Sequence, residues 1–313
     1  MRAFACEAVS LYRNLPWRFR IIFTLSTPPN TNPLPFPSLT VFASHTLYCA
    51  LHVQVVDLSM QSPATARQVA DNGLAAVNDT FEFLRSDGTR VPLRAAALEP
   101  ASAADNGAMV KFSTGVIRGS GALEVTDASR LSFGAVSGQP LIGPAIVPYL
   151  ERVAAYGACE ADVPRSVAYV LREGAALRRM LDTHAFVLVG ATSALGPVQT
   201  LLSLGATVVA ISRKGTKLRE LLQYASKSPA TVIVPMAAAS VGEDNESIAA
   251  AAGADVLTDA PALVDWLSEI APGKRLVIGS YIYLDSEAHV RASVAMEIIA
   301  SGVSSRRKDT ALA

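Results

Sequence analysis

One stretch in the second half of the chain combines two short apolar runs with a glycine turn and an amphipathic segment between them. Phe186 to Val189 is continuously apolar, which indicates a parallel strand buried on both faces. Gly190 ends this strand, Gly196 opens a helix, and Gly205 is expected to cap that helix in a left-handed conformation. Thr207 to Ile211 is the second apolar run. Together these segments have the length of one compact βαβ unit.

The alternation of strands and helices continues toward the end of the chain. Further strands are expected at Thr231–Met236, Ala254–Asp259 and Lys274–Tyr283, and Asp309–Ala313 is expected to begin a sixth. Gly253 is expected to cap the helix after the third strand, and two more helices are expected at 261–271 and 286–300. We therefore expect an α/β fold: a Rossmann-type doubly wound parallel sheet in the C-terminal half, preceded by a smaller α+β domain.

Open α/β sheets bind ligands beyond the carboxyl ends of their strands. That rule predicts one crevice around residues at the carboxyl ends of the expected strands, namely Gly190, Ser212, Met236, Ser280, Tyr281 and Tyr283.

The glycine turn has the chemistry of a diphosphate site. A diphosphate accepts hydrogen bonds from backbone N–H groups, and the chain must approach it without an intervening side chain. The turn residues expected to bind a dinucleotide are Gly190, Thr192, Ser193, Ala194, Leu195 and Gly196, with the hydroxyls of Thr192 and Ser193 as further donors. The alternative is a Rossmann-like crossover whose turn binds nothing.

The stretch VLVGATSALG resembles the cofactor turn of short-chain dehydrogenases/reductases, which reads TGxxxGxG or TGxxGxxG. Gly190 and Gly196 match the outer glycines, while Val189 replaces the threonine and the middle glycine is Ala194 or Ser193. The resemblance spans about 30 residues well and about 115 loosely. It implies an oxidoreductase that uses a nicotinamide cofactor.

The end of the second apolar run favours NADP(H) over NAD. Sites that prefer NAD place an acid there to hold the ribose hydroxyls. Here the chain offers Ser212, Arg213 and Lys214, and a guanidinium suits a 2′-phosphate. NAD is the alternative cofactor, and an exposed helix start is the alternative role for Arg213 and Lys214.

The resemblance weakens at the catalytic centre. Short-chain dehydrogenases use a serine after the fifth strand and a Tyr-x-x-x-Lys pair on the next helix, with tyrosine as acid/base. Ser280 fits the serine, but residues 288–302 contain neither tyrosine nor lysine. The catalytic candidates are therefore Ser280, Tyr281, Tyr283 and His289, with Arg291 as a cation nearby. A non-catalytic dinucleotide-binding or sensor protein is the alternative function.

A second glycine pattern matches TGxxxGxG literally. Thr114 to Gly121 follows a strand expected at Met109–Thr114, but no amphipathic helix and no second apolar strand come after it. Spacing without a strand–turn–helix context is weak evidence. We interpret its glycines as a turn between strands, with a phosphate site as the alternative.

The rest of the chain suggests three parts. Residues 1–59 are expected to be an unstructured or targeting leader, since the start is basic and five prolines follow between Pro28 and Pro37. The apolar run Leu39–Leu58 is interrupted by His45, His52, Gln54 and Asp57, which argues against a membrane span. Residues 60–183 form the expected α+β domain, with a hairpin around Ser86–Gly88, and residues 184–313 the Rossmann-type domain. Whether the Rossmann-type domain is truncated at its C-terminus is left open.

Composition narrows the function further. Half the residues are hydrophobic, 17% are charged and the formal net charge is zero, so no broad positive field for nucleic acid is expected. Three cysteines without CxxC spacing and four histidines without i, i+4 pairs predict no disulfide framework and no metal site. We therefore expect a cytoplasmic, NADP(H)-dependent oxidoreductase acting on an unidentified small molecule. Self-association and organelle import are left open.

Overall fold

A computed structural model describes residues 6–7, 24–25, 52–84, 88–98, 111–123, 132–136, 139–237, 242 and 244–313. The chain divides into two units, Met1–Ala96 and Ala97–Ala313. Residues 97–183, which were expected to form one domain with residues 60–96, thus share a unit with the second half of the chain. The boundaries expected at residues 59 and 183 stay predictions.

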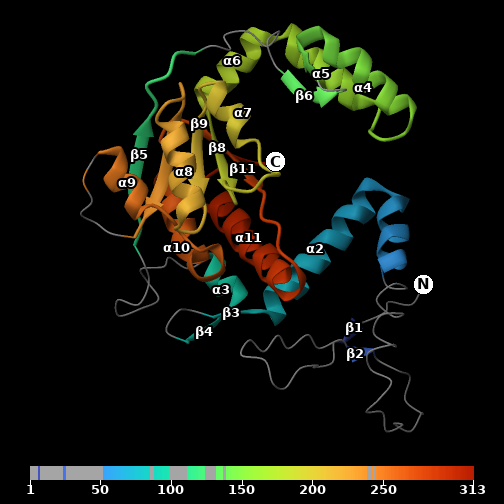
Figure 1. Ribbon diagram of the computed structural model, residues 1–313. Helices are drawn as coiled ribbons and strands as arrows, with labels where there is room; N and C mark the ends of the chain where they lie inside the picture. Colours follow the sequence, from blue (N-terminus) through green and yellow to red (C-terminus); the bar gives the residue numbers. More distant parts are fainter. Residues whose placement is uncertain are drawn as a thin grey trace, which may run out of the picture. The chain divides into compact units, whose positions relative to one another are not determined.

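The second unit is built on a six-stranded sheet in the order β12-β11-β8-β9-β10-β5 (Figure 1). All neighbouring strands are parallel except β5, which lies antiparallel to β10 at one edge. The strands are β5 (Ser113–Arg118), β8 (His184–Val189), β9 (Thr207–Ile211), β10 (Thr231–Met236), β11 (Arg275–Ser280) and β12 (Thr310–Leu312). The expected α/β sheet is confirmed at this level.

Helices connect the parallel strands. Those of the second unit are α4 (Ile146–Ala155), α5 (Asp162–Arg172), α6 (Gly174–Thr183), α7 (Val198–Ser203), α8 (Thr216–Ala225), α9 (Asn245–Ala251), α10 (Val256–Glu269) and α11 (Ser286–Arg306). A hairpin of β6 (Ser132–Val136) and β7 (Gln139–Ile142) and a 3₁₀ turn, η3 (Gly143–Ala145), precede α4.

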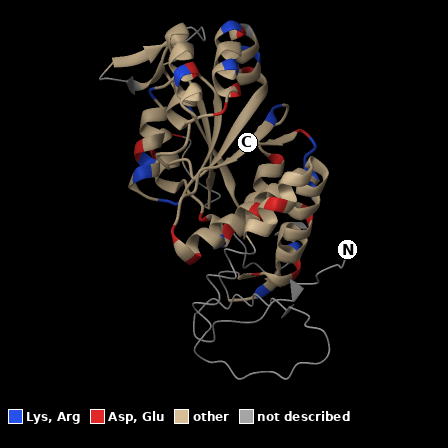
Figure 2. Cartoon of the chain, turned by 90° about the vertical axis from the view of Figure 1, so that its right-hand side faces the viewer, with Lys and Arg blue, Asp and Glu red and all other residues tan. Residues whose placement is uncertain are grey.

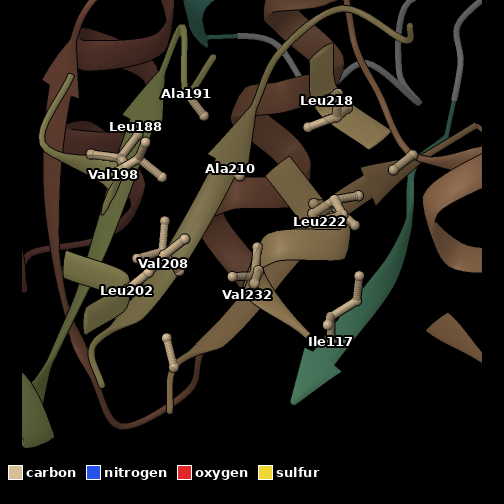
Figure 3. Packing of buried hydrophobic residues seen from close by; sticks show 14 of the residues in the cluster. Ile117, Leu188, Ala191, Val198, Leu202, Val208, Ala210, Leu218, Leu222 and Val232 are labelled. Carbon is tan, nitrogen blue, oxygen red and sulfur yellow. The ribbon is translucent and has the colours of Figure 1, made fainter. Parts of the chain in front are cut away.

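The core explains why the strands are continuously apolar. On one face of the sheet, Leu202 of α7 and Leu222 of α8 belong to a buried cluster that includes Leu188 and Val208 (Figure 3). On β5, Ile117 belongs to this cluster, whereas Thr114 lies on the opposite face and accepts a hydrogen bond from Trp266 Nε1 of α10. Helices therefore cover both faces. Lys, Arg, Asp and Glu are distributed over the helices with both signs mixed (Figure 2).

One expected strand is wrong. Ala254–Asp259 is not a strand, because the Asp255 side chain accepts a hydrogen bond from the Leu257 amide and caps α10 there. Asp259 instead lies in the first turn of α10, where its carboxylate accepts from the Asp255 amide at 2.8 Å. Residues 162–183 form two helices, α5 and α6, which are separated at Glu173 before Gly174.

The first unit contains a β1–β2 pair (Cys6–Glu7 and Thr24–Leu25), a helical stretch at 52–61, α2 (Pro63–Thr80) and a hairpin of β3 (Glu82–Leu84) and β4 (Arg90–Pro92). The antiparallel pairing of β3 with β4 confirms the hairpin expected around Ser86–Gly88. α3 (Leu93–Leu98) crosses into the second unit. Most of the expected leader lies outside the described residues. Within the described part of the chain, no helix is both long and apolar enough to cross a bilayer.

A single arginine closes the end of α10. The guanidinium of Arg307 donates to the carbonyls of Ile270, Ala271 and Lys274 and also to the Asp309 carboxylate. These carbonyls belong to the end of α10 and the turn that leads to β11, where backbone acceptors lack helical partners. The Arg307 side chain is only 10% exposed, and its donated bonds lower the pKa of Asp309 below the ordinary value for aspartate.

We expect Arg307→Met to lower the free energy of unfolding by about 3 kcal/mol, because several acceptors would lose a charged donor. Urea denaturation of the purified protein measures this change. Lys308→Met, an exposed neighbour, is the matched control and should change stability by no more than about 0.5 kcal/mol. Equal effects of the two substitutions would contradict the capping role.

Candidate functional site

The turn after β8 is fixed by Gly190. This residue has φ +88°, and a Cβ atom there would lie 2.9 Å from Ile282 N and from Tyr281 C. The amides of Gly190 and Ala191 both donate to the carbonyl of Ile211 at the end of β9. Gly190 is therefore required by the fold itself, because any side chain would be strained and would strike the segment after β11.

The remainder of the turn leaves backbone donors for a ligand. The Ser193 amide donates to the Gly190 carbonyl at 2.9 Å, and the Gly196 amide donates to the Ser193 carbonyl at 3.1 Å. The amides of Thr192 and Ala194 donate to no acceptor among the described residues. Ala194 and Leu195 are exposed, Leu195 at 71%. The turn can thus offer N–H groups to an anion.

Gly196 differs from Gly190 in what surrounds it. A Cβ atom at Gly196 would lie 3.4 Å from the Ser193 carbonyl oxygen and 3.5 Å from Tyr281 Cγ, which is ordinary contact. The fold therefore has room for a methyl group at Gly196. If this position requires glycine, the requirement comes from a ligand that passes over the turn.

The end of β9 lies beside the turn. The hydroxyls of Thr192 and Ser212 form a hydrogen bond of 2.8 Å. Arg213 and Lys214 are exposed, and neither side chain forms an ion pair or hydrogen bond with a described residue. The structure thus brings the glycine turn and the predicted cationic segment together at one edge of the sheet.

Tyr281 is the catalytic candidate that lies against the turn. Its amide donates to the Val189 carbonyl at 2.8 Å, and its ring covers Gly279, where a Cβ atom would lie 2.8 Å from Tyr281 Oη. The same side chain lies next to Gly196. Tyr281 therefore forms a side of the region where the turns after β8 and β11 meet.

The other catalytic candidates are solvent-exposed and joined by no recorded hydrogen bond. Ser280 ends β11, Tyr283 is 70% exposed, and His289 is exposed in α11. Since the expected strand Ala254–Asp259 does not form and α10 begins at Val256, β11 is the fourth parallel strand along the chain rather than the fifth. Ser280 therefore does not follow the strand that the resemblance to short-chain dehydrogenases would require.

Gly253 and Ala254 were not singled out as site residues by the sequence. Gly253 was expected only to end a helix, yet its backbone lies against Lys214, and the Ala254 amide donates to the Ser212 carbonyl at 2.9 Å. The left-handed glycine was visible in the sequence as a helix cap. Its contact with the end of β9 depends on the order of the strands and had no local signal.

The second glycine pattern is occupied by protein backbone. Thr114 and Gly115 lie within β5, not in a turn. The amides of Gly119, Ser120 and Gly121 donate to carbonyls of Ala230, Ser226 and Ser228. These donors are already used to hold the end of β5 against the turn between α8 and β10, so the three amides are not available to a phosphate.

A groove of about 680 Å³ lies along the face of β5 and β10, toward the amino ends of the parallel strands. Val116, Ile233 and Trp266 contribute apolar lining. Two of its polar groups already have protein partners: Trp266 Nε1 donates to Thr114 Oγ1, and Lys274 Nζ donates to the Asp182 carbonyl. Arg118 also lines the groove and is exposed. The groove lies at the amino ends of the parallel strands, whereas open α/β sheets bind ligands beyond the carboxyl ends, so the glycine turn is the better candidate site.

Among the described residues, no group of three or more His, Cys, Asp or Glu side chains is placed to hold a metal ion. No family model matches the chain, and no curated protein or solved structure matches it. The functional proposal therefore rests on the geometry of the turns after β8 and β11 and of the end of β9.

The two glycines make a testable distinction. Gly190→Ala should lower the free energy of unfolding by about 3 kcal/mol, from left-handed strain plus a backbone clash. Gly196→Ala should change it by less than about 1 kcal/mol, because its Cβ meets only ordinary contacts. Thermal or urea unfolding of both variants measures the difference. A larger loss for Gly196→Ala would mean that this glycine also serves the fold.

Proposed function

We propose that this chain binds NADP(H) at the carboxyl edge of a Rossmann-type sheet and acts as an oxidoreductase on a small molecule. The observation that carries the proposal is the position of the glycine turn. Counted along the chain, the five parallel strands lie in the order 3-2-1-4-5, and the turn follows the first of them. Dinucleotides bind where the strand order reverses in such sheets.

The residues of the turn fit a diphosphate. The unpaired amides of Thr192 and Ala194 and the hydroxyl of Ser193 are donors, and Gly196 leaves the chain free of a side chain beside them. Because α7 has only six residues, its dipole adds little, and the turn amides make the main contribution.

The segment after β9 supports a preference for the 2′-phosphorylated cofactor. Arg213 and Lys214 are exposed and available, and no carboxylate occurs between Ile211 and Glu220. A guanidinium can bind a phosphate through two parallel hydrogen bonds, whereas the ribose hydroxyls of NAD would lack an acidic partner here.

NADP(H) supplies a hydride when it is bound, so the chain itself must position the substrate and move a proton. Tyr281 is the candidate for the proton because its side chain lies beside Gly196. Ser280, Tyr283 and His289 are exposed around the same edge and are further candidates for substrate contact. We propose a protein similar to short-chain dehydrogenases/reductases that has diverged at its catalytic residues.

A non-catalytic dinucleotide sensor is the second candidate. It is favoured by α11, which contains neither tyrosine nor lysine, and by Asp285, which stands four residues after Tyr281 where a lysine would be needed. Turnover of NADPH with carbonyl substrates would support the enzyme, and tight binding without turnover would support the sensor.

Gly196→Val tests the turn directly. We expect the affinity for NADPH to fall at least about tenfold, about 1.4 kcal/mol, because a branched side chain would occupy the path of the diphosphate. Fluorescence titration measures the affinity, and circular dichroism checks that the variant is folded. Gly196→Ala is the control for a smaller side chain. Unchanged NADPH affinity in folded Gly196→Val would exclude the turn as the binding site.

Cofactor choice gives an independent test. Fluorescence titration of the wild-type protein should show a preference for NADPH over NADH of about ten- to hundredfold, equivalent to about 1.5–3 kcal/mol from one charged hydrogen-bonded pair. The double substitution Ser212→Asp with Arg213→Ala should invert this preference, since it removes the phosphate partner and adds an acid. Equal binding of both cofactors by the wild type would mean that Arg213 only begins an exposed helix.

A further inference from the structure

The segment Ser212–Lys214 has no regular secondary structure, yet it is held from two sides. β9 ends at Ile211 and α8 begins at Thr216, so the three residues lie in the connection between them. A phosphate contact from Arg213 or Lys214 depends on where this short piece of backbone lies. The structure shows two contacts that determine its position.

The first contact comes from the glycine turn. Thr192 Oγ1 and Ser212 Oγ are 2.8 Å apart, and both side chains are half-buried. This bond ties the start of the segment to the turn that follows β8.

The second contact comes from the chain between α9 and α10. Gly253 has φ +138°, and a Cβ atom there would lie 2.5 Å from Lys214 N and 2.7 Å from Lys214 Cα. The Ala254 amide donates to the Ser212 carbonyl, and the Gly253 amide donates to the Pro235 carbonyl, both at 2.9 Å. Gly253 therefore lets two backbone segments touch, and any side chain would push Lys214 away by about 1 Å to reach ordinary contact.

We propose that Thr192 and Gly253 are positioning residues for the discrimination between 2′-phosphorylated and unphosphorylated dinucleotides. They act through Ser212 and Lys214 and need not touch the 2′-phosphate. Charged binding groups must be held within about 0.5 Å of their productive geometry. Displacement of this segment should therefore weaken the binding of the 2′-phosphate more than the binding of the rest of the nucleotide. The inference rests on the proposed function.

The test compares Gly253→Ala with Gly273→Ala. Gly273 also has a positive φ, +80°, but a Cβ atom there would meet nothing within 4 Å, so this control places a side chain at a positive φ without the contact. Fluorescence titrations with NADPH and with NADH give the ratio of the two affinities for each protein. Gly253→Ala should lower the preference for NADPH about tenfold, and Gly273→Ala should leave it unchanged.

Thr192→Val provides a second test that adds no volume. If Thr192 only donated to the diphosphate, its loss would weaken NADPH and NADH equally and leave their ratio unchanged. A positioning role predicts a ratio that falls about five- to tenfold at an unchanged melting temperature. This variant decides the question if Gly253→Ala, unlike Gly273→Ala, does not fold.

The outcomes separate the inference from the proposed function. A wild-type protein that prefers NADPH, with ratios lowered in Gly253→Ala and Thr192→Val, supports both. A wild-type preference that stays unchanged in the folded variants overturns the positioning role and leaves the proposed function intact. A wild-type protein that binds neither cofactor, or both equally, overturns the proposed cofactor and the inference with it.

Discussion

Burial of the central strands on both faces is the constraint on which the rest of the structure depends. Val187, Leu188 and Val189 are at most 2% exposed, and the same holds for Val208 through Ile211. Parallel pairing suits strands buried in this way, because the helical crossovers between parallel strands lie on the faces of the sheet and cover them. The crossovers bring the carboxyl ends of the strands to one edge. The turns that follow β8, β9 and β11 consequently meet, although they are far apart in the sequence.

The two edges of the sheet therefore differ in chemistry. At the carboxyl edge, backbone approaches backbone so closely that Gly190 and Gly253 can carry no side chain, and amides of the turn stay unpaired. At the amino edge, two cationic side chains are bound by protein carbonyls: Lys274 donates to the Asp182 carbonyl, and Arg307 donates to carbonyls at the end of α10. Close backbone approach with free donors is what a phosphate group requires.

The sequence predicted those strands that are marked by a pattern of neighbouring residues. Thr207–Ile211 and Thr231–Met236 are strands with the expected bounds, because their apolar runs are uninterrupted and bounded by turns. Ala254–Asp259 was wrong because a short apolar run does not distinguish a strand from a buried helix start, and the carboxylate of Asp255 decides for the helix. The place of β5 could not be predicted either, since its pairing with β10 joins residues more than a hundred positions apart.

The candidate site likewise contains residues that the sequence singled out and a contact that it did not. The glycine turn and the segment Ser212–Lys214 were singled out from the sequence because glycine spacing and adjacent cations are short-range patterns, and the structure brings the two together. The contact of Gly253 with Lys214 was not found, because it exists only once β10 lies beside β9. A glycine that ends a helix and a glycine that positions a distant loop look the same in one sequence. The order of the strands thus determines which glycines the fold requires, as it does Gly190, and which have room for a Cβ atom, as Gly196 has.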